Sequence, residues 1–284
     1  MNRVINYEIS KENSNIKVYT FLKGREGYSS RLIRLLKARE GGILLNGAAV
    51  RTVDMLKEGD ILTVNIPEDK SDIEPVEMPL HIIYEDEDVL IINKPPYLAM
   101  HPTHNHQGDT LANAVTFHLA KEGKGTAYKA MGRLDKGTGG LVVLALNHLA
   151  ACRLSGNIQK EYEAIVKGQP QSSGRIDVPI YRPDPMITLR ACSYEKGTES
   201  AVTNYRVIER GEGQARVIFN LETGRTHQIR VHMAFIGHPL AGDSFYGDYR
   251  PEIGHQLLCC KKCSFIHPVT KENMVFEINS GFEV

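Results

Sequence analysis

The sequence predicts an α+β protein with a mixed, mainly antiparallel sheet and a small α/β module in front of it. From residue 131 onward, short β-rich runs such as LVVLAL (141–146) and EYEAIV (161–166) dominate, with few helical patterns between them. A parallel sheet of βαβ units would instead show regular alternation of strands and helices. The polar stretch PEDKSDIEPVEM (67–78) contains two prolines and is typical of a linker. We therefore expect an N-terminal module (1–66), a linker (67–78) and a larger domain (79–284).

The N-terminal module is expected to contain one short amphipathic helix. Ser29 or Ser30 can cap its N-terminus, and Gly41–Gly42 can end it. On a helical wheel the apolar and the basic residues occupy adjoining arcs. The apolar arc comprises Leu32, Leu35 and Leu36, and the basic arc comprises Arg31, Arg34 and Lys37. After the helix, Asn46–Gly47 predicts a tight turn between two short strands. The turn KEGD (57–60) precedes the strand ILTV (61–64).

The larger domain is expected to begin with HIIYEDEDVLIINK (81–94), two strands around an acidic turn. DTLANAVTFHLA (109–120) predicts a helix, and further strands are expected at TNYRVIE (203–209), ARVIFNLE (215–222) and NMVFEI (273–278). A second helix follows, with Thr226 as its N-cap and Gly237 at its end. Its apolar face would comprise Ile229, Met233 and Ile236.

Composition narrows the class of protein. The 284 residues are 42% hydrophobic and 24% charged, which is ordinary for a globular protein. The 34 basic and 34 acidic residues balance, which excludes a uniformly basic nucleic-acid binder but allows a local basic patch. No signal peptide and no apolar stretch of about 20 residues is visible, so we expect a cytoplasmic protein without a membrane span. The odd number of cysteines, five, also suits a reducing compartment.

The spacings of some cysteines, histidines and glycines partly match metal or cofactor motifs. Cys260 and Cys263 have the spacing of half a zinc site, with His267 nearby, but no second pair matches. Buried strand cysteines are the favoured interpretation, and no metal is expected. The histidines at 227, 232 and 238 lack the H-E-x-x-H spacing, so we expect positioning or packing roles for them. The glycines at 137 and 139 lack the remaining glycine and the strand-to-helix setting of a dinucleotide site.

The most informative segment is MGRLDKGTGGLVVLAL (131–146). It places Asp135 in a glycine-rich turn, two residues after Arg133 and just before an apolar, β-branched run. Such a carboxylate can be held at the end of a strand with its oxygens free for chemistry, although an isolated Asp before Gly and Thr is usually a turn or cap residue. QKEYEAIVKG (159–168) and ETGRTHQIRVHMAFIGHPLAGDSFYG (222–247) follow in order.

Together these segments resemble the RluA family of RNA pseudouridine synthases. GRLDKGTGGL resembles its HRLDxxTSGLL motif, KEY its K-x-Y strand, and TGRTHQIRVH with Gly242–Asp243 its TGRTHQIRxH and GD segments. INKPP (92–96) before His101–Pro102 resembles the opening of the family's catalytic domain. Gly132, Gly139 and Cys259 depart from the family pattern. The N-terminal helix, NG turn and EGD turn resemble the S4 RNA-binding module.

The resemblance implies an isomerase that converts uridine to pseudouridine in structured RNA and needs no cofactor. It implies Asp135 as the catalytic nucleophile, attacking either C1′ of the sugar or C6 of the base. Substrate-binding roles fall on four residues. Arg230 would pair with Asp135, and Tyr162 would stack on the base or pass a proton. Arg133 would fill the gap left by the flipped base or contact phosphate. Ile229 would line the pocket.

The S4-like face would bind RNA phosphates through its helix. The residues expected to do so are Ser30, Arg31, Arg34 and Lys37. Ribosomal RNA is favoured over transfer RNA, and a monomer is expected. Two alternatives remain open at this point. One is a catalytically silent RNA-binding or ribosome-assembly factor with the same fold. The other is a carboxylate hydrolase acting on glycosides or nucleosides, which would need a second catalytic carboxylate that no motif supplies.

Overall fold

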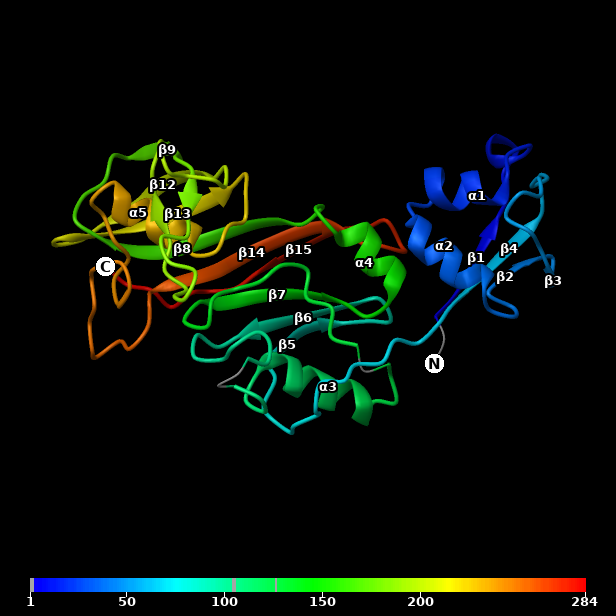
Figure 1. The fold of residues 1–284 in the computed structure, drawn as a ribbon, viewed down its shortest axis with the longest axis horizontal. Helices are drawn as coiled ribbons and strands as arrows, with labels where there is room; N and C mark the ends of the chain where they lie inside the picture. Colours follow the sequence, from blue (N-terminus) through cyan, green and yellow to red (C-terminus); the bar gives the residue numbers. More distant parts are fainter. Residues whose placement is uncertain (1–2, 104–105, 126) are drawn as a thin grey trace.

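The computed structural model describes residues 3–103, 106–125 and 127–284. Two sheets form the bodies of the molecule, one at each end of an elongated chain (Figure 1). The N-terminal body is an antiparallel sheet in the order β1-β4-β2-β3. Its elements are β1 (Arg3–Glu8), a 3-10 helix (Lys11–Asn13), α1 (Val18–Thr20), a π-helix (Phe21–Arg25), α2 (Ser30–Lys37), β2 (Ile43–Leu45), β3 (Ala48–Ala49) and β4 (Ile61–Ile66).

Helix α2 matches the predicted helix at its N-terminus but not in its length or its buried face. The Ser29 side chain accepts a hydrogen bond from the backbone N–H of Leu32 at 3.1 Å, as expected of an N-cap. The helix ends at Lys37, before the predicted glycine pair. Leu35 was expected in the core but is 39% exposed, and Ile33 is buried in its place. The sheet approaches the helix from the side of Ile33, a direction that the helical wheel alone does not specify.

The predicted NG hairpin is confirmed. Asn46 and Gly47 join β2 to β3 with φ angles of 51° and 81°. Positive φ at both central residues is the geometry of the tight hairpin turn that matches strand twist. The KEGD turn is confirmed as well, because the Asp60 backbone N–H donates to the Lys57 carbonyl at 3.1 Å immediately before β4.

Within the described part of the chain, the larger body is a nine-stranded sheet that begins with β5 (Ile82–Glu85) and β6 (Val89–Lys94). Its order is β5-β6-β7-β14-β8-β13-β12-β9, with β15 paired to β14. The β7–β14 contact is parallel and the other pairs are antiparallel, which confirms the mixed, mainly antiparallel sheet. The remaining strands are β7 (Gly139–Ala145), β8 (Gln159–Lys167), β9 (Ser173–Asp177), β12 (Val202–Arg210), β13 (Gln214–Leu221), β14 (Leu258–Ile266) and β15 (Asn273–Glu277); β10 (Ile180–Tyr181) and β11 (Ala191–Cys192) form a separate pair.

Three helices flank this sheet: α3 (Leu111–Lys121), α4 (His148–Leu154) and α5 (Gln228–Phe235). Helix α3 lies beside β5 and β6, and α5 lies at the far end over β12 and β13 (Figure 1). Helix α3 confirms the predicted helix and is capped by Thr110. The prediction for α5 was wrong at its start, because His227, not Thr226, is the N-cap. His227 adopts a left-handed φ of 58°, and the Gln228 side chain accepts from the Arg225 backbone N–H.

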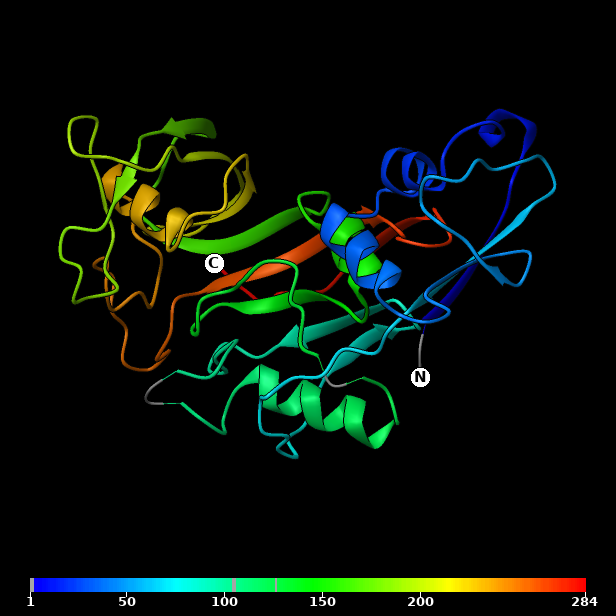
Figure 2. The ribbon, with the colours of Figure 1, turned by 45° about the vertical axis from the view of Figure 1, so that its right-hand side comes forward.

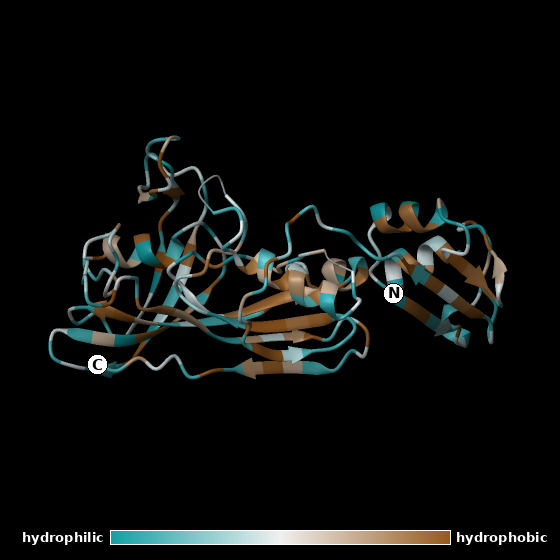
Figure 3. Cartoon of the chain, turned by 90° about the horizontal axis from the view of Figure 1, so that it is seen from below, coloured by the Kyte–Doolittle hydropathy of each residue, from teal (hydrophilic) through white to brown (hydrophobic). Residues whose placement is uncertain are grey.

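The core of the larger body lies along β6 and β7, whose residues are almost fully buried. The hydrophobic colour of the central strands runs along the sheet beneath the helices (Figure 3). Cys260 and Cys263 on β14 belong to this core, which confirms the prediction of buried strand cysteines. Residues 67–81 contain no helix or strand. No helix in the described ranges has the length and apolar character needed to cross a bilayer.

Candidate active site

A cavity of about 880 Å³ opens on the larger body where the loop before β7, the start of β8 and the start of α5 meet. All five residues predicted for the catalytic site line it. They are Arg133, Asp135, Tyr162, Ile229 and Arg230. They come from three segments that are far apart in sequence. The fold therefore brings together the three motifs that the sequence singled out.

Asp135 lies in the turn that leads into β7, where its carbonyl accepts from the Thr138 backbone N–H at 3.0 Å. Its side chain is 16% exposed, so solvent and a ligand in the cavity can both reach it. The Arg230 Nη1 donates to the Asp135 Oδ2 at 3.2 Å, and the His227 Nε2 lies 3.9 Å from the same oxygen. The second carboxylate oxygen has no hydrogen bond within the described residues.

Arg230 is held mainly by Asp243, which is fully buried. Its Nε and Nη2 donate to the two Asp243 oxygens at 2.7 and 2.8 Å, a bidentate pairing. Asp243 also accepts from the backbone N–H groups of Phe245 and Tyr246. One guanidinium edge is thus anchored in the protein, and Nη1 is left to face Asp135. Burial lowers the pKa of Arg230, but Asp243 and Asp135 more than offset this and its pKa is raised. Arg230 is therefore a permanent positive charge.

Two aromatic rings pack against Arg230. The Arg230 guanidinium lies 5.2 Å from the ring centres of both Phe245 and Tyr246. The Tyr246 hydroxyl lies 2.9 Å from His227 Nδ1. Burial, together with the charge of Arg230, lowers the pKa of His227 to about 4 despite the nearby carboxylates. His227 is therefore a neutral imidazole beside Asp135 at physiological pH.

Tyr162 lies on β8 and is packed between the two main apolar clusters of the larger body. Burial raises the pKa of its phenol well above the ordinary value, and nearby Cys260 and Asp135 act in the same direction. The phenol therefore keeps its proton and can donate a hydrogen bond. Ile229, 4% exposed, contributes apolar surface to the cavity.

Arg133 and Lys160 also line the cavity. Arg133 is exposed, whereas the Lys160 ammonium donates to the Met131 carbonyl at 3.2 Å and so holds the segment before Asp135. Gly132 lies between them with a φ of 98°, and a Cβ there would come within 3.1 Å of the Lys160 Nζ. Two cationic side chains therefore flank the entrance to the cavity.

Lys94, at the end of β6, contacts the segment that carries Asp135 and was not among the predicted site residues. It is 1% exposed, and its ammonium donates to three backbone carbonyls. The acceptors are Pro95 at 2.9 Å, Leu98 at 2.8 Å and Lys136 at 3.3 Å. Burial lowers the pKa of Lys94 to about 7, while the charge of Asp135 acts in the opposite direction. Lys94 thus ties the loop after β6 to the residue that follows Asp135.

A second, smaller hollow of about 450 Å³ lies on the N-terminal body. It is lined by Tyr19, Ser30, Ile33, Arg34, Lys37, Ala38 and Thr52. Three of the four residues predicted to bind RNA are among them, and the fourth, Arg31, is exposed on the same helix. The basic face of α2 is therefore open to solvent and slightly concave.

Metal ligation has one geometric candidate among the described residues. Asp86, Asp88 and His267 bring ligand atoms within 4.8 Å of one another. Asp86 already accepts from Tyr84, His267 and two backbone N–H groups. Asp88 accepts from Arg3 and Asn147. All three side chains therefore form hydrogen bonds with other groups of the protein. His232 and His238 have different partners: His232 bonds to Thr203 and Val178, and His238 lies near the Lys167 carbonyl.

A carboxylate that lines a cavity beside a buried arginine is an arrangement typical of enzyme active sites. Comparisons with known proteins specify the family. Residues 88–235 match the family model described as RNA pseudouridylate synthase. The chain belongs to this family, within its RluA-type branch, and is an RNA pseudouridine synthase, an isomerase.

Curated relatives match almost the whole chain. An uncharacterized RNA pseudouridine synthase of Bacillus subtilis, YjbO, is 40% identical over 263 residues, which cover 89% of this chain and 92% of the relative. Ribosomal large subunit pseudouridine synthase D of Vibrio cholerae is 38% identical over 258 residues, or 84% of this chain and 79% of the relative. Among solved structures, human RNA pseudouridylate synthase domain containing 1 is 24% identical with a TM-score of 0.57, covering 72% of this chain and 86% of that one. This last likeness supports the fold.

Proposed function

We propose that Asp135 is the nucleophile with which this pseudouridine synthase isomerises uridines in ribosomal RNA. The observation that carries the proposal is the Arg230–Asp135 contact at 3.2 Å inside the cavity, with the rest of the guanidinium anchored on Asp243. This arrangement orients one carboxylate oxygen and leaves the other free for the substrate. Attack at C1′ of the sugar and addition at C6 of the base are both compatible with it.

The isomerisation balances without a cofactor. The bond between N1 of the uracil and C1′ breaks, and the base turns within the cavity. A bond then forms between C5 and C1′, C5 loses its hydrogen as a proton, and N1 gains one. Tyr162 can stack on the flipped base. Because its buried phenol keeps its proton, Tyr162 can alternatively pass a proton to the base. Ile229 packs against the base, and exposed Arg133 contacts phosphate or fills the vacated position in the RNA.

RNA outside the cavity is proposed to bind the basic face of α2, as in an S4 module. Ser30, Arg31, Arg34 and Lys37 lie on its exposed side. The name of the Vibrio cholerae relative, a ribosomal large subunit pseudouridine synthase, supports large-subunit ribosomal RNA as the substrate. We also propose that the protein is cytoplasmic and acts as a monomer. The proposed domain division is 1–66, 67–78 and 79–284.

The deciding experiment measures tritium release from large-subunit ribosomal RNA that is labelled at C5 of uridine. Asp135→Asn should lower the rate at least about a thousandfold, because the nucleophile is lost. Binding of the RNA should persist. Asp184→Asn, an exposed aspartate in the loop between β10 and β11, serves as the matched control and should react at the wild-type rate. Near-normal turnover by Asp135→Asn would remove Asp135 from its role.

The RNA-binding face is tested separately. Arg31→Glu combined with Arg34→Glu should weaken RNA binding and reduce its salt dependence, because two cationic contacts are lost. Arg210→Glu is the control, since Arg210 is an exposed cation at the end of β12 in the larger body, where it bonds to Gln169 and Pro170. Unchanged affinity of the double variant would show that RNA docks elsewhere.

A further inference from the structure

Helix α4 belongs to both bodies of the molecule. Leu149 is completely buried in the apolar core of the N-terminal body, where Cys152 also packs. Ala150 and Leu154, on the same helix, are buried in the core of the catalytic body. Figures 1 and 2 both place α2 beside α4. The charge of Arg31 on α2 contributes to lowering the pKa of His148 at the start of α4. The two bodies are therefore joined by a shared helix as well as by the linker.

Arg153 is the polar centre of this joint. Its side chain is 10% exposed, and its Nη2 contacts Glu26 at 2.6 Å. Its Nε donates to the Glu26 carbonyl at 2.8 Å, and its Nη1 donates to the Pro268 carbonyl at 2.5 Å. The guanidinium also reaches the Tyr7 hydroxyl at 3.3 Å and lies 5.8 Å from the ring centre of Tyr28. One buried cation thus holds segments of the N-terminal body against the turn between β14 and β15.

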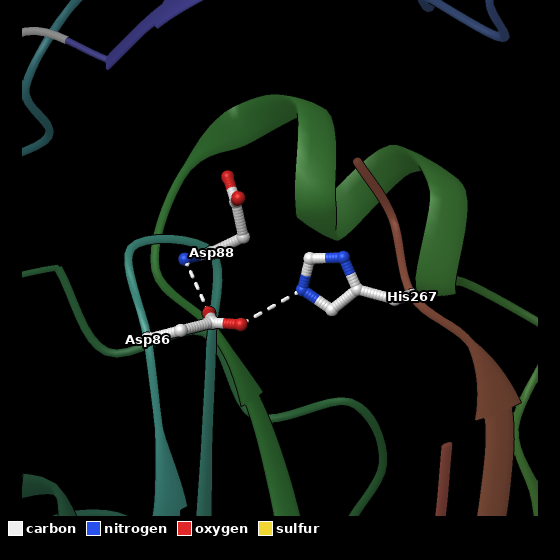
Figure 4. Close-up of side chains that lie close together, drawn as sticks. All are labelled: Asp86, Asp88 and His267. Carbon is white, nitrogen blue, oxygen red and sulfur yellow. Dashed lines mark hydrogen bonds and ion pairs between the residues drawn. The ribbon is translucent and has the colours of Figure 1, made fainter. Parts of the chain in front are cut away.

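A second contact supports the same joint at the other end of α4. Arg3 on β1 donates to both oxygens of Asp88, at 3.0 and 2.8 Å. Asp88 also accepts from the Asn147 side chain, whose carbonyl oxygen caps α4 through the Ala150 backbone N–H. In Figure 4 the Asp88 carboxylate is directed away from the hydrogen bond between Asp86 and His267. Asp88 therefore links β1 to the N-terminus of α4.

The C-terminal end of α4 reaches the catalytic cavity. Leu154, Ser155 and Gly156 line the same cavity as Asp135. The helix that carries Arg153 on its N-terminal-body side therefore ends beside the substrate. A shift of the N-terminal body about this joint would change the separation between the basic face of α2 and the cavity.

We propose that Arg153 is a positioning residue that fixes the N-terminal body on the catalytic body and thereby selects RNAs long enough to contact both. This rests on the proposed function, because it requires RNA on α2 and in the cavity. An RNA bound to one site experiences a high effective concentration of the second only when the two sites are held at a matching separation. Arg153 itself touches no RNA in this scheme.

The first test needs no RNA. In the wild type, Arg153 should protect the linker from trypsin at exposed Lys70, and the radius of gyration in solution should match the structure. Arg153→Met retains the length of the side chain but removes the guanidinium. It should speed cleavage at Lys70 several-fold and broaden the distance distribution in small-angle scattering. Arg210→Met, at an exposed arginine at the end of β12 that bonds to Gln169 and Pro170, should leave both unchanged.

The second test compares two RNA probes by dissociation constant and by tritium release. One is a full-length large-subunit ribosomal RNA transcript, and the other is a short hairpin around the mapped uridine. Arg153→Met should raise the dissociation constant for the long RNA about tenfold and leave that for the hairpin unchanged. The kcat on the hairpin should remain within about twofold of wild type. Arg153→Lys, which keeps a cation, should restore part of the affinity for the long RNA.

The outcomes separate this proposal from the proposed function. If Arg153→Met binds both RNAs like wild type, or weakens both equally, Arg153 does not select long RNAs and the proposal is overturned. If Arg153→Met fails to fold, Glu26→Gln, which removes the charge of the partner, decides by the same comparison. If the wild type releases no tritium but Arg153→Met still speeds cleavage at Lys70 and broadens the distance distribution, the proposed function fails and the joint stands.

Discussion

Replacing Asp243 with asparagine should cost both stability and activity, although Asp243 lies outside the substrate cavity. The Asp243 carboxylate is fully buried and accepts two hydrogen bonds from Arg230 and two from backbone N–H groups. Asparagine keeps the shape but loses the charge, and it turns an amide N–H₂ toward a donor. Arg230 would then be a buried guanidinium whose remaining carboxylate partner, among the described residues, is Asp135.

The magnitude follows from the burial of the pair. Breaking a buried ion pair by removing one partner costs about 3–5 kcal/mol. Because asparagine retains one acceptor oxygen, we expect about 3 kcal/mol for Asp243→Asn. Arg230 should also move toward Asp135, and a displacement of about 1 Å at a reacting group can lower the rate about a hundredfold. Urea unfolding gives the free energy, and single-turnover tritium release well below the unfolding transition gives the rate.

A double-mutant cycle isolates the pair from its surroundings. Arg230→Gln removes the opposite charge, so the double variant with Asp243→Asn should be more stable than the two single losses predict. Asp248→Asn is the matched control, since Asp248 pairs with Arg250 nearby without touching Arg230. A loss of less than about 1 kcal/mol in Asp243→Asn, or additive losses in the cycle, would refute the view that Asp243 anchors the arginine.

Three further predictions concern the same region. Since the folded-state pKa of Lys94 is lowered to about 7, the free energy of unfolding should rise between pH 7 and pH 10, and urea titrations of Lys94→Met should lack this rise. Because the pKa of His227 is lowered to about 4, the free energy of unfolding should decrease as the pH falls from 6.5 to 4, and this decrease should be smaller in His227→Gln. Gly140→Ala should lower stability by about 3 kcal/mol or more, because its Cβ would meet the Cys260 carbonyl oxygen at 2.4 Å at a φ of 107°. Thermal unfolding should show Gly139→Ala tolerated, since its closest contact is 3.4 Å.

The sequence predicted the strands well because alternating or continuous apolar runs report burial directly. It could not predict their order in the sheet. The parallel contact between β7 and β14 joins residues 139–140 to residues 259–260, and no local pattern records such a pairing. The start of α5 was misplaced for a related reason. Threonine is a favourable N-cap residue, but Gln228 bonds to Thr223, Arg225 and β12, and these contacts set where the helix begins.

The motifs predicted the residues that line the candidate site, but not the roles of the residues that hold them in place. Asp135, Tyr162 and Arg230 do meet in one cavity. Asp243 and Lys94 were seen only as matches to family segments, although one anchors Arg230 and the other holds the loop beside Asp135. Their signals were a charged residue within GD and another directly before two prolines. A buried charge shows its role only when its partner is known, and that partner comes from elsewhere in the chain.

Buried contacts join the two bodies in addition to the proline-containing segment 67–78. A flexible segment limits how far two bodies can separate, whereas buried contacts decide whether they separate at all. Those contacts are made by Arg153 and Leu149 on α4, by Glu26, and by Arg3 with Asp88, residues that no single motif unites. We therefore expect substitutions at this joint to change which RNA is bound before they change how fast a bound uridine reacts.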